Sequence, residues 1–220
     1  MLYGYRFKRT TCPAQGLPPI SRSRSRRVLF DPCETPQFQI GAPPPTGTRS
    51  VDVAGIDLSA LRDTRDNPLN PEHGSFLSLN VLVAPQLLGS DFDFTKEFAQ
   101  LSVTKALGRS PMTWAHGYRF GLIQVLGGQR LPFDDLFRAG GPNSIRGFDI
   151  DGVGPRGSSN LPIGGEAVIV LNQELRYRNE RTGLGAAVFW DAGQVFAKVR
   201  DIDFDLRHSV GVGLRYDSPV

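Results

Sequence analysis

The residues of this chain that could carry out chemistry are few, and most of them form no site. The three histidines, His73, His116 and His208, lie on separate segments, so neither a metal site nor a catalytic centre is expected. No serine sits in the Gly-flanked turn that presents a nucleophile in hydrolases. Arg146 stands out, because it lies between a turn-forming cluster and a Gly-Phe pair. We therefore expect no enzyme, no cofactor and no bound metal.

Arg146 belongs to a long segment, Gly128 to Gly165, that is too rich in glycine and proline for a helix or a regular strand. A loop of this length in an otherwise regular chain is usually functional or disordered. Disordered linkers are poor in apolar residues, whereas such residues recur here: Phe137, Ile145, Phe148, Ile150 and Val153. We expect this loop to fold back and pack against the rest of the chain.

Elsewhere the chain alternates apolar and polar residues with a period of two, which predicts β-strands. Eight segments show the pattern: 1–9, 51–61, 76–84, 94–107, 114–126, 167–178, 184–193 and 209–216. Most are about 10 residues long, a length that fits strands crossing a membrane. A soluble sandwich with one buried face per strand is the alternative. The barrel is favoured because the polar faces carry arginines and carboxylates that need a wet interior.

Composition narrows the function further. The 25 glycines and 14 phenylalanines suit a β-barrel, and no apolar run is long enough for a transmembrane helix. The net charge is +3, but no aromatic residues interleave the arginines of the one basic cluster, at positions 22–27, so we expect no nucleic-acid binding. Residues 1–50 read as a short strand followed by a Pro/Ser/Arg-rich, partly disordered loop, without the apolar core of a signal peptide.

Three stretches, taken in order and with their spacing, resemble one family. Arg62–Leu69 resembles its short periplasmic turn, Gly140–Phe148 its loop-six signature, and Phe189–Phe196 the strand that follows one hairpin later. The family is that of the BamA/TamA-type outer-membrane assembly barrels (bacterial surface antigen family), which has organellar relatives and includes two-partner secretion transporters. The resemblance covers about residues 51–220.

This resemblance implies an all-β fold, an antiparallel transmembrane β-barrel. The family barrel has 16 strands, of which this chain would hold about eight, the seventh to the fourteenth. Residues 51–220 would form the barrel portion, with loop 128–165 folded inward. The periplasmic domains and the last strands would be absent, so we expect a C-terminal barrel fragment that does not close into a stable barrel by itself.

The resemblance also implies a loop-anchoring site in the barrel lumen, formed by Arg146, Gly147, Phe148, Glu174 and Asp191. The strand alternation independently puts both carboxylates on polar faces. If a tight turn at 179–182 sets the register, Asp191 lies opposite Val170, four residues or about 13 Å from Glu174. Arg146 would then bind one carboxylate directly and the other through water.

By the same resemblance, the function is insertion and assembly of outer-membrane proteins by a cofactor-free barrel in the bacterial outer membrane, with an organellar outer membrane less favoured. Its partners would be the lipid bilayer, unfolded outer-membrane protein clients, and periplasmic or lipoprotein accessory subunits. Two alternatives stay open: a polypeptide secretion pore of the two-partner type, and an inactive fragment. The domains preceding the barrel would discriminate between the assembly function and the secretion pore.

The two cysteines, Cys12 and Cys33, fall in the segment that this topology assigns to the outside of the cell. Because the outer envelope is oxidising, a disulfide between them is a hypothesis. Two unpaired thiols in a disordered segment are the alternative.

Overall fold

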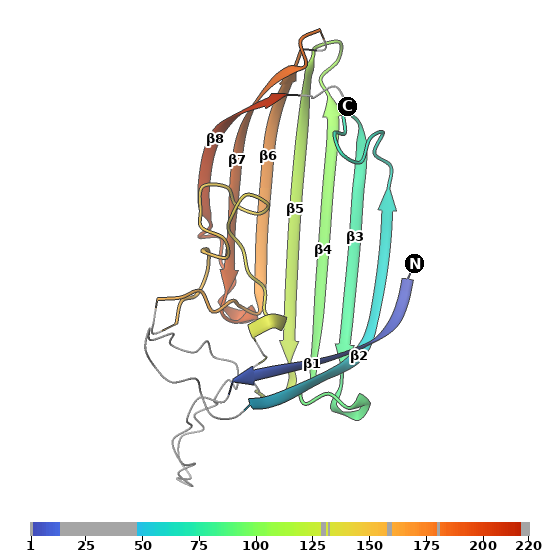
Figure 1. Cartoon of the computed structure of the whole chain (residues 1–220), viewed down its shortest axis with the longest axis vertical. Helices are drawn as coiled ribbons and strands as arrows, with labels where there is room; N and C mark the ends of the chain where they lie inside the picture. Colours follow the sequence, from blue (N-terminus) through green and yellow to red (C-terminus); the bar gives the residue numbers. More distant parts are fainter. Residues whose placement is uncertain are drawn as a thin grey trace.

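The computed structural model of the chain forms one antiparallel β-sheet of eight strands, in the order β1 to β8 (Figure 1). It describes residues 2–13, 48–128, 131, 133–157, 160–179 and 181–216. The strands are β1 (Leu2–Pro13), β2 (Thr48–Asp63), β3 (Gly74–Ala84), β4 (Phe94–Ala106), β5 (Met112–Val125), β6 (Ala167–Arg178), β7 (Leu184–Phe196) and β8 (Arg207–Tyr216). Each strand pairs with its neighbour in sequence, so the predicted all-β antiparallel fold is confirmed.

The sheet is an open, curved arc rather than a closed ring. β1 and β8 form its two edges, and no pairing joins them in the described part of the chain (Figure 1). An arc with two unpaired edges is the shape expected of a portion of a larger barrel, because a closed barrel has no edge strand.

The first two strands are longer than predicted. β1 extends to Pro13 instead of ending at residue 9, and β2 begins at Thr48 instead of residue 51. The extension arises because the two strand ends pair with each other, Pro13 opposite Thr48. Residues 14–47 lie outside the described residues. The partial disorder predicted there and the Cys12–Cys33 disulfide therefore stay predictions.

The two faces of the sheet differ as the alternation predicts. On β8 the side chains of Val210, Val212 and Leu214 lie on the convex face and are 77%, 80% and 93% exposed. The residues between them on the concave face are glycines or polar. The convex faces of β2, β3, β5, β6 and β7 also carry exposed apolar or aromatic side chains. An outward apolar band of this kind is typical of strands that face lipid.

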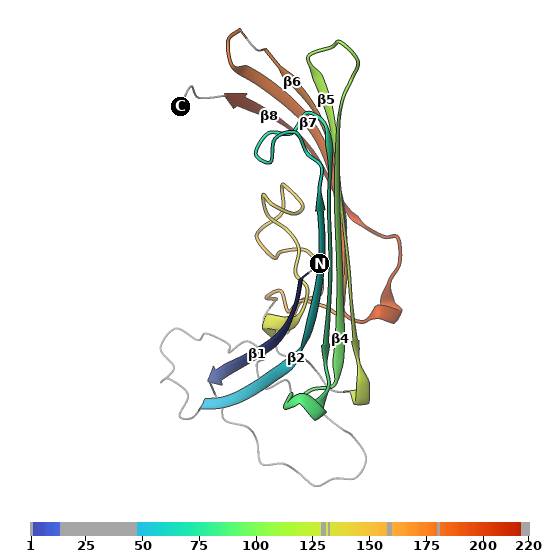
Figure 2. The same ribbon diagram turned by 90° about the vertical axis from the view of Figure 1, so that its right-hand side faces the viewer.

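Two connections bend onto the concave side of the sheet. The connection between β5 and β6, residues 126–166, is called the long loop, and residues 64–73 form the β2–β3 turn at the opposite end of the sheet. Figure 2 shows both of them on the side toward which the strands curve. The described helices are short 3-10 segments: η1 (Gln86–Leu88), η2 (Leu126–Gly128), η3 (Phe133–Asp135) and η4 (Val199–Asp201). None of the helices in the described ranges is long and apolar enough to cross a membrane.

The hydrophobic core lies between the long loop and the concave face of the sheet. Ile145 of the loop is fully buried, and it belongs to the same cluster as Ile123, Val170 and Val195 of the strands. The loop therefore folds back and packs, as its apolar residues predict. Ile150 is an exception at 75% exposed; it lies in the tight turn in which the Gly152 N–H donates to the Asp149 carbonyl (2.9 Å).

Candidate functional site

The long loop presents one arginine side chain to the concave face of the sheet. The Gly141 N–H donates to the Phe148 carbonyl (3.1 Å), which closes a compact turn around the residues between them. Gly147 has φ +85°, a conformation that glycine adopts without the steric cost of a Cβ. Ile145 is buried beneath this turn, while Phe148 is partly buried against the core. The backbone of the turn thereby directs Arg146 toward β6 and β7.

Arg146 binds two carboxylates directly. Its Nε and Nη2 donate to Oδ2 and Oδ1 of Asp191 at 2.7 and 2.8 Å, a bidentate pair, and its backbone N–H donates to the same Oδ2 at 3.0 Å. Its Nη1 donates to Oε2 of Glu174. The pKa of Arg146 is raised above its usual value, chiefly by the hydrogen bond to Asp191. We call Arg146, Glu174 and Asp191 the loop anchor.

Asp191 has no solvent exposure, and two further side chains complete its surroundings. The Asn172 amide donates to Oδ1 of Asp191 and to the Ser144 carbonyl of the loop, both at 2.8 Å. The Phe189 ring lies under the guanidinium, with its centroid 3.6 Å from Cζ of Arg146, a cation–π contact. Sequence reasoning missed both roles. Their signal was present, since Phe189 and Asn172 occupy the polar faces of their strands and an aromatic residue is unusual there.

The register of β6 and β7 differs from the prediction by two residues. Asp191 pairs with Asn172, two positions from Glu174, rather than with a residue four positions away. The hairpin is shifted by one residue along the chain rather than lengthened: its closing pair is Asn179 and Leu184, with the Asn179 N–H donating to the Leu184 carbonyl (2.8 Å), instead of positions 178 and 183. The two carboxylates therefore lie close enough for one guanidinium to reach both. The predicted water-mediated contact was wrong.

A second contact between the long loop and the sheet was not anticipated. The Phe137 ring packs over Gly121 of β5, where an added Cβ would lie 2.5 Å from the ring. Lys96 of β4 lies 4.8 Å from the centroid of the same ring and donates to the Asp135 carbonyl at 2.6 Å. Both Phe137 and Gly121 were visible in the sequence pattern. Their contact was not, because it depends on where the loop crosses the sheet.

The β2–β3 turn is built from short-range hydrogen bonds. The Asp66 carboxylate accepts the backbone N–H groups of Asn67 (2.8 Å), Glu72 (3.1 Å) and His73 (3.1 Å). Burial acts to raise the pKa of Asp66, but these hydrogen bonds outweigh it and the pKa is lowered. Glu72 also accepts from Arg178 of β6 at 3.0 Å, which ties the turn across the concave side.

This arrangement joins the long loop to β6 and β7 by ionic hydrogen bonds. The loop anchor pairs a permanently charged cation with two carboxylates through direct hydrogen bonds. Among the described residues, no group of His, Cys, Asp and Glu side chains could hold a metal ion. The chemistry available here is electrostatic attachment of a loop to a sheet.

Comparison with known proteins places this geometry in a family. The profile of the Omp85 superfamily domain matches residues 21–220. The chain belongs to the Omp85 superfamily. Proteins of this superfamily reside in outer membranes and include assembly factors rather than catalytic enzymes.

Individual relatives agree with this assignment. The chain is 28% identical over 178 residues to the sorting and assembly machinery component 50 homolog of Bos taurus, covering 73% of this chain and 37% of that protein. It is 29% identical over 164 residues to the outer membrane protein assembly factor BamA of Nitratidesulfovibrio vulgaris, covering 72% and 20%. The chain thus spans well under half of these relatives.

A solved structure shares the fold. The crystal structure of BamA from Haemophilus ducreyi lacking POTRA domains 1–3 superposes with a TM-score of 0.69 at 20% sequence identity, covering 81% of this chain and 39% of that one. The predicted resemblance to a BamA-type barrel portion is confirmed.

Proposed function

We propose that this chain is part of an outer-membrane β-barrel that inserts and assembles other outer-membrane proteins without a cofactor. Membership of the Omp85 superfamily supports this proposal, as do the assembly functions in the names of the relatives from Bos taurus and Nitratidesulfovibrio vulgaris. The chain covers only part of those proteins. The activity of the whole protein is therefore extended to this chain by similarity.

The observation that carries the proposal is the direct binding of Arg146 to both Glu174 and Asp191. We assign Arg146, Gly147, Phe148, Glu174 and Asp191 the role of holding the long loop inside the barrel lumen. A buried ion pair is costly to break at one partner, since the other charge is left without compensation. The loop would therefore keep one position while neighbouring strands move to admit a client.

The sheet offers a surface for each proposed partner. The apolar convex face suits the lipid bilayer, because lipid-facing strands carry outward apolar side chains. A client strand would pair by backbone hydrogen bonding with a strand edge of the complete barrel, in which β1 and β8 themselves have partners. Accessory subunits and a specifically bacterial outer membrane stay predictions, since the relatives come from vertebrates as well as from a bacterium.

The test is client assembly by the full-length protein in its native outer membrane. We expect Arg146→Ala to lower the rate at which a client barrel becomes heat-resistant on gels, without lowering the amount of the folded protein itself. The matched control is Arg138→Ala, which removes an exposed ion pair of the same loop, 3.4 Å from Asp151. Normal client assembly in Arg146→Ala would contradict the role of the anchor. Loss of polypeptide secretion with normal client insertion would favour a secretion pore instead.

A further inference from the structure

The concave face near the loop anchor carries more guanidinium groups than carboxylates. Glu174 accepts hydrogen bonds from Arg176 (2.7 Å) and Arg215 as well as from Arg146. With Arg119 nearby, four arginines share two carboxylates, Glu174 and Asp191, among the described residues; a fifth arginine that lines the cavity, Arg65, has a carboxylate of its own, Asp63. The group therefore has two positive charges in excess. An excess of positive charge inside a confined space raises the local concentration of negatively charged ligands.

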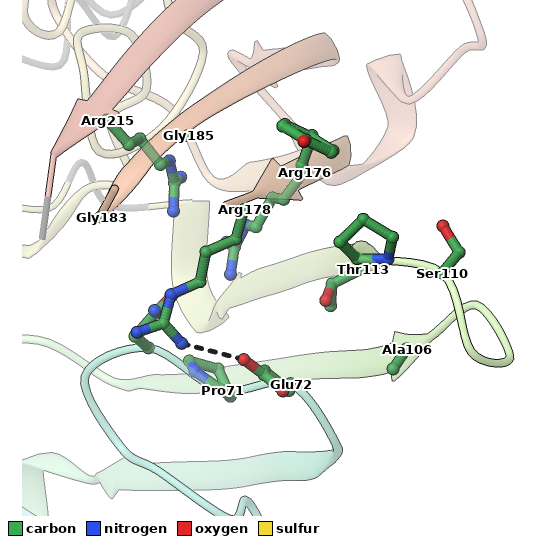
Figure 3. A pocket seen from close by; sticks show the side chains of 13 residues that line it. Pro71, Glu72, Ala106, Ser110, Thr113, Arg176, Arg178, Gly183, Gly185 and Arg215 are labelled. Atoms are coloured by element: carbon green, nitrogen blue, oxygen red, sulfur yellow. Dashed lines mark hydrogen bonds and ion pairs between the residues drawn. The ribbon is translucent and has the colours of Figure 1, made fainter. Parts of the chain in front are cut away.

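These arginines line a cavity of about 380 Å³ that lies between the β2–β3 turn and the long loop. A second space of about 440 Å³ adjoins it on the side of the loop, and Arg119, Arg146 and Glu174 line both. Figure 3 shows a smaller hollow at the end near the turn, where Arg178 reaches Glu72 and the side chains of Arg176 and Arg215 lie nearby. The hollows together form a trough along the concave face.

Arg119 is the arginine of this trough that is least neutralised. Its Nη1 donates to the Asn143 carbonyl at 2.6 Å, a neutral acceptor. Within the ranges that the structure describes it has no carboxylate in hydrogen-bond contact. A guanidinium carries five N–H donors in a planar fork that matches a carboxylate. The remaining donors of Arg119 can therefore receive an anionic group from a ligand in the trough.

The trough also has an apolar wall. Leu69 of the β2–β3 turn is 96% exposed, and it lines the same cavity together with Pro68 and Pro71. A free phosphate would leave this wall unused. A lipid headgroup would have to leave the apolar convex face on the opposite side of the sheet. A ligand that combines carboxylates with apolar side chains satisfies both surfaces.

We propose that this trough binds an acidic stretch of extended polypeptide, with a carboxylate on Arg119 and an apolar side chain against Leu69. The inference rests on the proposed function, because a client chain is the polypeptide that would arrive there. It adds a binding site on the concave face, separate from the strand edges at which backbone pairing takes place.

The test compares two fluorescent peptides on the full-length protein in nanodiscs of uncharged phosphatidylcholine. One peptide alternates glutamate with leucine, and its twin has glutamine at every glutamate. We expect the glutamate peptide to bind about tenfold more tightly at low salt, the range of a hydrogen bond to a charged group. Added salt should shrink this ratio, because it screens charges in a wet trough. Arg119→Gln should reduce the ratio to near one, and Arg119→Lys should keep part of it.

Arg109→Gln is the matched control, since Arg109 is exposed in the β4–β5 turn and is not among the residues that line the three hollows. It should leave the peptide ratio unchanged, and heat-dependent gel mobility should show that every variant is folded. Equal binding of the two peptides, or equal effects of Arg119→Gln and Arg109→Gln, would overturn the inference. So would Arg119-dependent displacement of the peptide by phosphatidylglycerol nanodiscs, which would identify a lipid headgroup as the occupant.

Client assembly measured on the same preparations separates this inference from the proposed function. A wild-type protein that assembles clients but binds both peptides equally disproves the trough alone. A protein that shows the Arg119-dependent peptide ratio but assembles no client disproves the proposed function alone.

Discussion

The long loop and the β2–β3 turn both bend onto the concave side of the sheet, yet they are held there by different means (Figure 2). Arg146 of the loop binds residues 45 and 28 positions away in sequence. Asp66 of the turn binds backbone groups between one and seven positions away. The turn can therefore form from its own sequence, whereas the loop needs the finished sheet.

The two regions also differ in burial, and this sets the size of the effects expected from mutation. Asp191 is fully buried, so removing its partner leaves a charge that water cannot solvate. Asp66 is largely exposed, with 44% of its side-chain surface accessible, so water can replace lost hydrogen bonds. Mutations of the anchor should be severe and mutations of the turn mild.

Asp191→Ala should have the largest effect on the loop. It removes three hydrogen bonds to Arg146 and leaves a partly buried guanidinium without its main partner. We expect the free energy of loop opening to fall by about 3 kcal/mol. Hydrogen exchange at the Val153 amide, which donates to the Ala139 carbonyl at 3.0 Å, measures this opening. The control Asp201→Ala removes an exposed carboxylate and should leave the exchange rate unchanged.

Gly121→Ala should weaken the second attachment of the loop. The new methyl group would lie 2.5 Å from the Phe137 ring and push it away from Lys96. Overpacking of this kind costs about 2 kcal/mol. Faster exchange of the Phe137 amide, which donates to the Gly165 carbonyl at 2.9 Å, would report it. Gly213→Ala is the matched control, because no atom lies within 4 Å of its added Cβ.

Arg146→Lys should produce a smaller loss than Asp191→Ala. Lysine keeps the positive charge but cannot make the paired hydrogen bonds of the planar guanidinium. Losing one charge-assisted hydrogen bond costs about 1.5 kcal/mol. The accessibility of the loop to protease should lie between those of the wild type and Arg146→Ala. If lysine and alanine gave the same digestion pattern, charge alone would contribute nothing at this site.

Asp66→Asn should have the smallest effect and should stay within the β2–β3 turn. Because the pKa of Asp66 is lowered in the folded protein, its carboxylate stabilises the turn above its unfolded pKa of about 3.9. That stabilisation is lost as the pH falls through the lowered folded value. We expect the Glu72 and His73 amides to lose protection in acid, after correction for intrinsic exchange. Asp66→Asn should remove this pH dependence, and a simultaneous response of the Val153 amide would show that the two regions are coupled.

The comparison also explains which parts of the molecule could be predicted from sequence. Strand alternation depends on neighbouring residues, so the eight strands and their two faces could be predicted. The turn motif and the Gly-rich segment around Arg146 could be predicted for the same reason. The register of β6 and β7 could not be predicted, because it depends on which two residues close one hairpin, here Asn179 and Leu184.

Contacts between the loop and the sheet could be predicted only in part. Arg146, Glu174 and Asp191 were named together through a family resemblance, and alternation placed the two carboxylates on polar faces. The alternation placed Asn172 on a polar face, but the local sequence did not show that it would bridge the loop and Asp191, or that Phe137 would meet Gly121. Such contacts follow from the path of the long loop across β4, β5, β6 and β7, which no short-range pattern encodes.

The most direct test of the account is a double-mutant cycle between Arg146→Ala and Asp191→Ala, read by hydrogen exchange of the Val153 amide. If the two residues hold the loop through one interaction, each single variant should weaken loop closure by a similar amount, and the double variant should be little worse than either. The expected coupling is about 3 kcal/mol in size. Losses that add fully in the double variant, or a loop that stays protected in Arg146→Ala, would contradict the claim that this ion pair anchors the loop.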